Sequence, residues 1–188
     1  MALEITGERV VQEDSFLVMK ERSFIDRSGA SRKWSYVSRR NDRGAVVIVP
    51  TTRESGSLIV IRQFRVPFGG ALIEFPAGLI DDGEEPDKAA LRELEEETGY
   101  RGRIVSVGPA VSTSAGLTTE LVHIVYVETD EHPEAERENG PESSEDIEVM
   151  RIPRAGCAEA LRRWNEAGDI LDIKLYLHFQ SVIAALRV

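Results

Sequence analysis

Short apolar runs separated by turn residues make up much of the chain, and such runs predict strands. The run at residues 45–50 is continuous, which is typical of a strand buried on both faces. The turn at residues 54–56 predicts a hairpin between that strand and residues 57–65. Four further strands are expected, at residues 73–75, 104–107, 121–127 and 147–152.

Three segments have the pattern of helices. Residues 86–98 begin at Pro86, which suits the first helical position, and end before Gly99, which suits a left-handed C-cap. Residues 155–167 and 172–186 close the chain as two more helices. The alternation of strands and helices predicts an α/β fold in which helices flank a mixed sheet.

Two regions lie outside this pattern. Residues 4–40 form a small β-rich segment, in which the turn at residues 26–29 predicts a hairpin. Residues 129–144 contain Pro, Glu and Gly without any periodicity, so we expect a loop there, and loops of this length often carry function.

Composition and charge bear on the number of domains, the kind of partner and the cellular compartment. Its 188 residues are 41% hydrophobic and 30% charged, as expected for one soluble domain with a short N-terminal extension. The net charge of −10 argues against nucleic acid as a partner, since such binding needs a basic surface. No apolar run approaches the roughly 20 residues that span a bilayer, so no membrane association is expected. The single cysteine, Cys157, and the lack of a visible secretory signal favour the cytoplasm.

Glu93, Glu96 and Glu97 would share one face of the helix at 86–98, because spacings of three and four residues coincide on a helix. Like charges in this arrangement cost roughly 0.2–0.5 kcal/mol per pair. The three glutamates could simply be a solvated outer face. A hard divalent cation such as Mg²⁺ would also neutralise them, because it prefers carboxylate oxygens and leaves positions for water and phosphate.

The spacing of the residues around these glutamates favours the metal. It resembles the Nudix box, the metal-binding loop–helix–loop of the Nudix hydrolases. The matching positions are Gly78, Glu84, Arg92, Glu93, Leu94, Glu96, Glu97 and Gly99. Tyr100 departs from the pattern, since an aliphatic residue is usual there. Segments 63–70 and 73–81 extend the resemblance to the ADP-ribose and ADP-sugar pyrophosphatases, over residues 14–154 in all.

The resemblance implies an α/β/α sandwich with a mixed sheet and two parts to the chain. Residues 1–42 would form an N-terminal β segment that is exchanged between the subunits of a homodimer. Residues 43–188 would form the Nudix hydrolase domain. The implied reaction is Mg²⁺-dependent hydrolysis of ADP-ribose or a related ADP-sugar to AMP and a sugar phosphate, with Mn²⁺ able to replace Mg²⁺. Three alternatives remain: hydrolysis of oxidised guanine nucleotides, hydrolysis of other nucleoside diphosphate derivatives, and nucleotide binding without catalysis.

The resemblance also assigns catalytic and metal-binding residues. Glu93 and Glu97 match the main metal ligands, Glu96 the third, and Ala77 a main-chain carbonyl ligand. Glu145 aligns with the loop glutamate that acts as general base or orients the water, and Glu142 and Glu148 are alternative candidates for this role. Arg92 and Glu84 would form an ion pair that braces the loop, with Arg92 pointing away from the metal ligands.

The implied substrate-binding residues come from four segments. Phe16 and Trp34 would sandwich the adenine, although both are also plausible as ordinary core or interface residues. Arg39 and Arg65 would bind phosphate oxygens through their forked guanidinium groups. Gly116 and Glu120 match a substrate loop, in which Glu120 would hydrogen-bond the terminal ribose.

Two features of the remaining sequence bear on these assignments. Ala115 stands in the substrate loop where the family usually has proline, which leaves the sugar specificity open. His123 and Cys157 are expected to be structural, because each lies within an apolar strand or helix.

Overall fold

A computed structural model of the chain describes residues 3–134 and 146–187. Its larger sheet contains β4 (Ala45–Thr52), β5 (Leu58–Arg65), β6 (Gly70–Glu74), β7 (Ala77–Leu79), β8 (Gly102–Ser112), β9 (Leu121–Thr129), β10 (Ile147–Ile152) and β11 (Ile170–Leu171). The strand order is β11-β6-β5-β4-β9-β8, with β10 paired to β5 and β7 paired to β4. The β4–β9 and β6–β11 pairs are parallel and the other pairs are antiparallel, so the sheet is mixed, as predicted.

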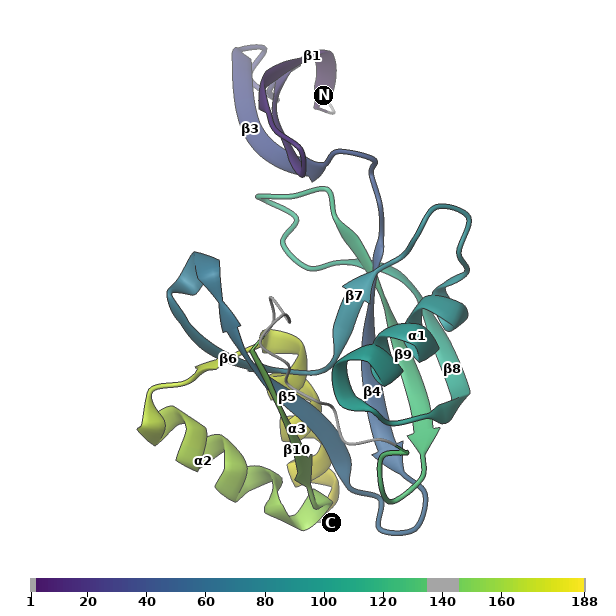
Figure 1. Cartoon of the computed structure of the whole chain (residues 1–188). Coiled ribbons are helices and arrows are strands. Elements are labelled where there is room, and N and C mark those ends of the chain that lie inside the picture. Colours follow the sequence, from purple (N-terminus) through teal and green to yellow (C-terminus); the bar gives the residue numbers. More distant parts are fainter. Residues whose placement is uncertain (1–2, 135–145, 188) are drawn as a thin grey trace.

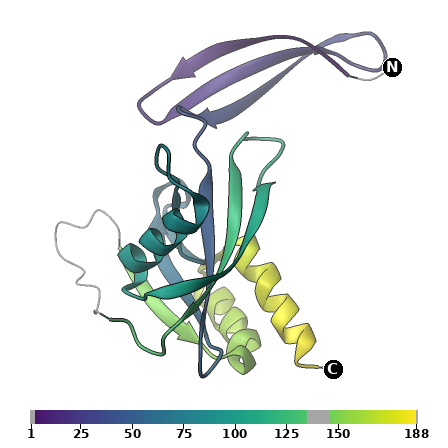
Figure 2. The same cartoon turned by 90° about the vertical axis from the view of Figure 1, so that its right-hand side faces the viewer.

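Helices cover both faces of this sheet (Figures 1 and 2). One face carries α1 (Pro86–Thr98), whose Ala89, Ala90 and Leu94 pack into one core cluster. The other carries α2 (Cys157–Ala167) and α3 (Ile173–Ala185), which pack into a second cluster. Single 3-10 turns lie at Val66–Phe68 and Arg154–Gly156. The predicted α/β/α sandwich is confirmed.

The expected hairpin between β4 and β5 is present only at its turn. The two strands share one register pair, Thr51 with Leu58. Strand β4 pairs along its whole length with β9, and β7 occupies the start of its other edge. Because β7 takes that place, β5 diverges from β4 and pairs instead with β6 and β10.

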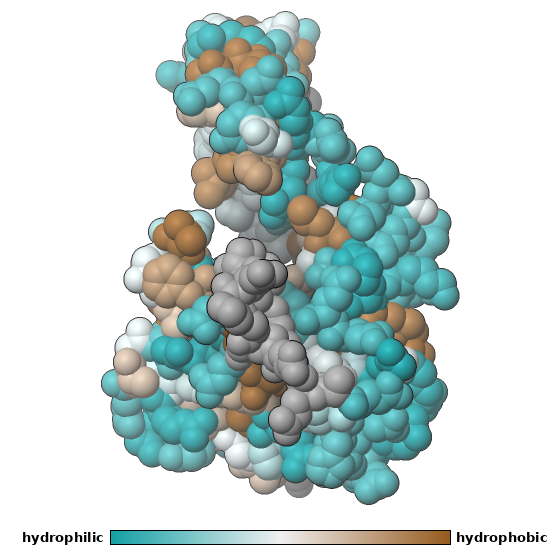
Figure 3. Space-filling model, viewed as in Figure 1, coloured by the Kyte–Doolittle hydropathy of each residue, from teal (hydrophilic) through white to brown (hydrophobic). Residues whose placement is uncertain are grey.

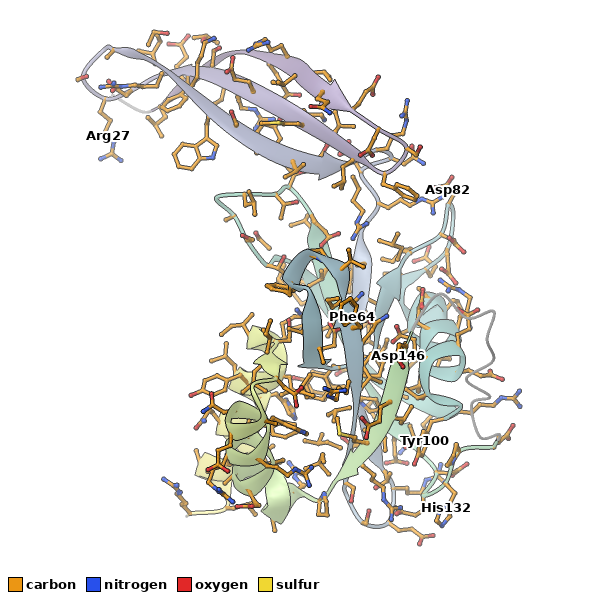
Figure 4. The ribbon with its side chains drawn as sticks, turned by 60° about the vertical axis from the view of Figure 1, so that its left-hand side comes forward. Arg27, Phe64, Asp82, Tyr100, His132 and Asp146 are labelled. Carbon is orange, nitrogen blue, oxygen red and sulfur yellow. The ribbon has the colours of Figure 1, made fainter. Side chains whose placement is uncertain are left out.

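Residues 4–39 form a separate three-stranded antiparallel sheet. Its hairpin at residues 26–29 was predicted. Its strands are β1 (Glu4–Glu13), β2 (Leu17–Ile25) and β3 (Ser31–Arg39). Figure 2 shows this sheet lying across one end of the larger body, and Figure 4 shows Arg27 at its free tip. Strand β3 docks on the 113–120 loop, since the Val37 amide donates to the Leu117 carbonyl (2.9 Å) and the Thr119 amide to the Val37 carbonyl (3.2 Å).

This N-terminal sheet exposes many apolar side chains in the single chain. They are Leu3, Ile5, Val10, Val11, Phe16, Leu17, Met19 and Trp34. Figure 3 shows apolar atoms on this sheet and also at the tip of the β5–β6 hairpin, where Val66 and Phe68 are exposed. None of the helices in the described part of the chain combines the length and apolar character needed to cross a membrane.

Candidate active site

Helix α1 presents its glutamates in two directions. Its bounds match the predicted residues 86–98, and Gly99 ends it in the left-handed conformation with φ 72°. Glu97 is only 5% exposed, whereas the side chain of Glu96 is 59% exposed. The helix therefore directs Glu93 and Glu97 into the protein and Glu96 toward solvent.

Strand β7 meets the buried glutamates at two small residues. The Ala77 amide donates to Oε2 of Glu97 over 3.0 Å. A Cβ atom at Gly78 would lie 1.8 Å from the carboxyl carbon of Glu93 and 2.0 Å from its Oε1. A side chain at residue 78 would therefore displace the Glu93 carboxylate, which occupies that space. This contact brings Ala77, Glu93 and Glu97 together.

Arg92 holds the loop before α1 against the helix. Its Nε and Nη2 donate to the two oxygens of Glu84 (3.0 and 2.9 Å), and Nη2 also donates to the Leu79 carbonyl (3.0 Å). This ion pair keeps the pKa of Glu84 below its ordinary value. The Glu84–Arg92 brace is thus present.

The expected orientation of Arg92 away from the metal ligands is wrong. Its Nη1 donates to Glu93 (2.8 Å) and Glu96 (3.1 Å). An arginine carries five N–H donors in a fork, so one side chain can serve the loop and both glutamates. Arg92 therefore supplies part of the positive charge that this helix face needs.

The donor set suits a hard cation, because it consists of carboxylate and main-chain oxygens. Across residues 3–134 and 146–187, no three Asp, Glu, His or Cys side chains are grouped closely enough to hold a metal ion as they stand. Glu93, Glu96 and Glu97 would have to turn toward one another to share one.

A cleft of about 600 Å³ lies beside these residues. The charged residues that line it are Arg39, Arg65, Glu74, Glu93, Glu97, Glu120 and Lys174. Ala77 and Gly78 also contribute to its wall. The structure thus brings together residues that were assigned from four separate segments of the sequence.

Each of the two cleft arginines is held by a carboxylate. Arg39 Nε donates to Glu120 over 2.5 Å, and Arg65 Nε donates to Glu74 over 2.7 Å. These bonds fix the orientation of each guanidinium in the cleft. Glu120, which was assigned to the ribose, therefore also orients Arg39.

The two aromatic residues assigned to the base lie outside this cleft. Trp34 is 55% exposed, and its Nε1 donates to the Gly116 carbonyl over 2.9 Å. With Ala115 it lines a neighbouring pocket of about 300 Å³. Phe16 is 75% exposed and precedes β2.

Phe16 and Trp34 of one chain are too far apart to sandwich one base. Leu17, next to Phe16, pairs with Arg39, whereas Trp34 pairs with Arg22, five positions further along the hairpin. At about 3.3 Å per residue, this separation is roughly 17 Å.

The predicted general base, Glu145, lies outside the described residues, as does Glu142. Glu148 lies in β10 on an exposed position. The chain is described again from Asp146, whose carbonyl accepts from the Phe64 amide over 3.4 Å, and Figure 4 shows both residues close together on the main body.

Tyr100, His123 and Cys157 have structural positions. Tyr100 is buried in the α1 core cluster, so it fills the position of the usual aliphatic residue, and burial raises its pKa. His123 Nδ1 lies 2.9 Å from the Gly108 carbonyl, and Cys157 is buried.

Two cleft residues were not foreseen from the sequence. Glu74 is 6% exposed, and burial raises the pKa of its carboxyl while the Arg65 hydrogen bond opposes the rise. The sequence did contain a signal for Glu74, because it is a single acidic residue between Ile73 and Phe75 in an apolar strand, where charged residues are rarely buried without a partner. Lys174 gave no signal, because one lysine at the start of a helix is ordinary.

Comparison with known proteins places this architecture in a family. Residues 42–172 match the model of the NUDIX domain. The chain is 35% identical to the ADP-sugar pyrophosphatase of Mus musculus, over 80% of this chain and 73% of the relative. It is 41% identical to the ADP-ribose pyrophosphatase of Bacillus subtilis, over 76% of each chain.

A solved structure described as an ADP compounds hydrolase superposes with a TM-score of 0.71 at 26% identity, and the match covers 100% of this chain and 98% of that one. The domain match, the identities over most of each chain and the shared fold agree with the box around α1, so this chain belongs to the Nudix family.

Proposed function

We propose that this protein hydrolyses the pyrophosphate bond of ADP-ribose or a related ADP-sugar, releasing AMP and a sugar phosphate. The observation that carries the proposal is the cleft in which Arg39 and Arg65 face Glu93 and Glu97. The same cleft therefore contains arginines that could bind a diphosphate and carboxylates that could bind its metal ion. The names of the mouse and Bacillus subtilis relatives support the same substrate class.

Ala77, Glu93 and Glu97 would hold a divalent cation, with Glu96 as a further ligand. Mg²⁺ is the ion we propose, and Mn²⁺ would serve in its place. Such an ion neutralises diphosphate oxygens and lowers the pKa of a bound water. We assign Glu145 to orienting that water and accepting its proton.

Arg39 and Arg65 would bind the phosphate oxygens. Their Nε atoms are engaged by Glu120 and Glu74, so each guanidinium is already oriented before a substrate arrives. Charge-assisted bonds from a preset guanidinium stabilise negative charge that grows on the phosphate oxygens during the reaction.

The base would stack on Trp34, with Phe16 of a second subunit on its other face. This arrangement follows from the roughly 17 Å between the two positions in one chain, obtained from their strand register at about 3.3 Å per residue. The apolar residues that the N-terminal sheet exposes are consistent with a homodimer.

The test is a substrate panel with purified protein and Mg²⁺. ADP-ribose, ADP-glucose, GDP-mannose, NADH and 8-oxo-dGDP are incubated in parallel, and products are separated by chromatography. Preferential release of AMP from ADP-ribose or ADP-glucose is expected. Preference for 8-oxo-dGDP would replace the substrate assignment, and no turnover of any compound would favour nucleotide binding without catalysis.

Glu97→Gln supplies the control for this panel. The loss of a metal-binding carboxylate is expected to remove several kcal/mol of transition-state stabilisation. Turnover should therefore fall on the order of a hundredfold or more. AMP binding should persist, and unchanged turnover would contradict the role given to Glu97.

A further inference from the structure

The pocket beside Trp34 lies between the N-terminal sheet and the 113–120 loop. Its volume is about 300 Å³. The sheet contributes Phe24 and Trp34 to its wall, and the loop contributes Ala115. Among the described residues that line the pocket, Arg22 alone carries a charge. A single guanidinium thus lies in a pocket whose other walls are apolar or neutral.

Arg22 and Trp34 are neighbours on the face of the sheet that lines this pocket. They are directly opposite each other in the register of β2 and β3, so they share a face and their Cβ atoms lie about 4.5–5.5 Å apart. Tyr36 follows two positions after Trp34 on the same face. The Arg22 guanidinium lies over the Tyr36 ring, with Cζ 5.0 Å from the ring centroid. A base stacked on Trp34 would therefore lie within reach of this guanidinium.

Glu8 holds the guanidinium in place. Its residue is directly opposite Arg22 in β1, and its Oε2 accepts from Nε (3.0 Å) and Nη2 (2.5 Å) of Arg22. Nη2 also donates to the Tyr36 hydroxyl over 3.0 Å, and that hydroxyl donates to Glu8 over 2.5 Å. The arginine is thus oriented before a ligand arrives, so little of its conformational freedom is lost on binding.

These contacts leave one end of the guanidinium for a ligand. Within residues 3–134 and 146–187, no hydrogen bond engages Nη1 of Arg22, which carries two N–H donors. Because the Glu8 carboxylate already balances the charge of Arg22, a neutral acceptor suits this position better than a second anion. A purine offers neutral acceptors at its ring nitrogens, and its face can stack on an aromatic side chain.

We propose that Arg22 donates a hydrogen bond to an acceptor atom on the edge of the purine that stacks on Trp34, and so helps to select the base of the substrate. This inference rests on the proposed function, because that function places the base at Trp34. Nη1 makes the bond to the base while Nε and Nη2 stay on Glu8. Stacking on Trp34 tolerates any base, whereas the bond from Arg22 depends on where the acceptor atoms of the base lie.

The test removes the donor and the acceptor separately. AMP and its 1-deaza, 3-deaza and 7-deaza analogues, each of which lacks one ring nitrogen, are titrated with Mg²⁺ by calorimetry into the full chain and into its Arg22→Met variant. In the parent, one analogue should bind about tenfold more weakly than AMP, as expected for the loss of a hydrogen bond to a charged donor. Arg22→Met should weaken AMP about tenfold and should bind that analogue as tightly as AMP.

Two controls accompany these titrations. Ribose 5-phosphate has no base, so its affinity should stay within about twofold of the parent in Arg22→Met. Arg9→Met is the matched variant, because Arg9 Nε donates to Glu21 over 2.9 Å in the same sheet, yet Arg9 follows Glu8 directly and so lies on the other face. It should change none of the affinities. Thermal unfolding identifies a misfolded variant, in which case Arg22→Gln is measured in place of Arg22→Met.

Three results would overturn the proposal for Arg22. They are equal weakening of AMP and all three analogues in Arg22→Met, an unchanged AMP affinity in that variant, and equal binding of AMP and every analogue by the parent. The first would mean that Arg22 supports the sheet without contacting the base. Absence of ADP-ribose turnover in the parent protein would reject the proposed function instead. Because calorimetry needs no turnover, the two results are obtained independently.

Discussion

At the scale of single residues, the active site depends on the absence of a side chain at Gly78. Its missing Cβ leaves room for the Glu93 carboxylate. The group in the way of a Cβ is the end of a flexible side chain, so Glu93 can move aside without unfolding the protein. A methyl group at residue 78 should therefore disturb the chemistry more than the fold.

Gly78→Ala is expected to lower kcat/KM at least tenfold and to raise the Mg²⁺ concentration needed for half-maximal activity. The free energy of unfolding should change by less than about 1 kcal/mol, as for substitutions outside a packed core. Enzyme assays across a Mg²⁺ series and urea unfolding measure the two effects. Gly7→Ala is the control, because nothing lies within 4 Å of a Cβ there. A Mg²⁺ dependence unchanged from the parent would contradict this account of Gly78.

Glu74 is a residue at which function and stability oppose each other. Burial raises the pKa of its carboxyl, so the folded protein binds that proton more tightly than the unfolded chain does. The resulting stabilisation is present below the ordinary carboxyl pKa of 4.5 and is lost as the pH rises through the folded value. The hydrogen bond from Arg65 favours the charged form and so opposes this rise in pKa.

Glu74→Gln should therefore be as stable as the parent protein at pH 7 or more stable, yet less active. The difference in unfolding free energy, parent minus variant, should fall as the pH is raised above 4.5. Activity should fall roughly tenfold, because a bond to a charged partner is worth about 1.5–3 kcal/mol. Chemical unfolding at several pH values and steady-state kinetics provide the measurements. Glu166→Gln, at an exposed position of α2, should show neither effect.

At the scale of elements, α1 and the loop before it act as one unit joined by Arg92. The arginine bonds Glu84, the Leu79 carbonyl, Glu93 and Glu96. A lysine keeps the charge but has no fork and cannot reach all of these acceptors. The helix, its loop and its ligands are thus positioned by one planar group.

Arg92→Lys should lower the free energy of unfolding by about 1–3 kcal/mol, because partly buried acceptors such as Glu84 and the Leu79 carbonyl lose their donors. Activity should fall as well, since Glu93 loses a fixed partner. Arg101→Lys, whose arginine pairs with exposed Glu95 and Glu134, should cost less than about 1 kcal/mol. Urea unfolding measures the free energy of unfolding of both variants. An equal decrease in the two would count against a special role for Arg92.

At the scale of the whole molecule, the hydrogen bonds described between the N-terminal sheet and the body come from β3, while many apolar side chains of that sheet are exposed. A small sheet of this kind gains stability by packing against another surface. We propose a second copy of the chain as that partner, and it would also supply Phe16 opposite Trp34.

Light scattering should give twice the chain mass of 20.9 kDa. Trp34→Ala should raise KM for ADP-ribose roughly 5- to 150-fold, because stacking of one base is worth about 1–3 kcal/mol. Trp34→Phe should retain most of the affinity, since it keeps a ring. A monomeric mass would contradict the homodimer, and an unaffected KM would remove Trp34 from the base site.

The sequence predicted α1 to the residue, because Pro86 and Gly99 are strong local end signals. It also predicted the β2–β3 hairpin and the buried β4. Strand β1 was missed because both of its faces are exposed, so it has no apolar alternation. The place of Lys174 in the cleft needed the structure, because α3 is far along the chain from the other residues that line it. The bonds from Arg92 to Glu93 and Glu96 needed it too, because sequence spacing does not fix where a long side chain points.

The hydrogen bonds between β3 and the 113–120 loop hold Trp34, Gly116 and Glu120 in place. These residues lie outside the sheet that supports helix α1. Mutations that accumulate in β3 and the 113–120 loop over evolution would change which nucleotide is selected and leave the carboxylates of α1 in place. A lineage could therefore gain a new substrate by altering two peripheral segments, while the inherited hydrolytic apparatus is passed on unchanged.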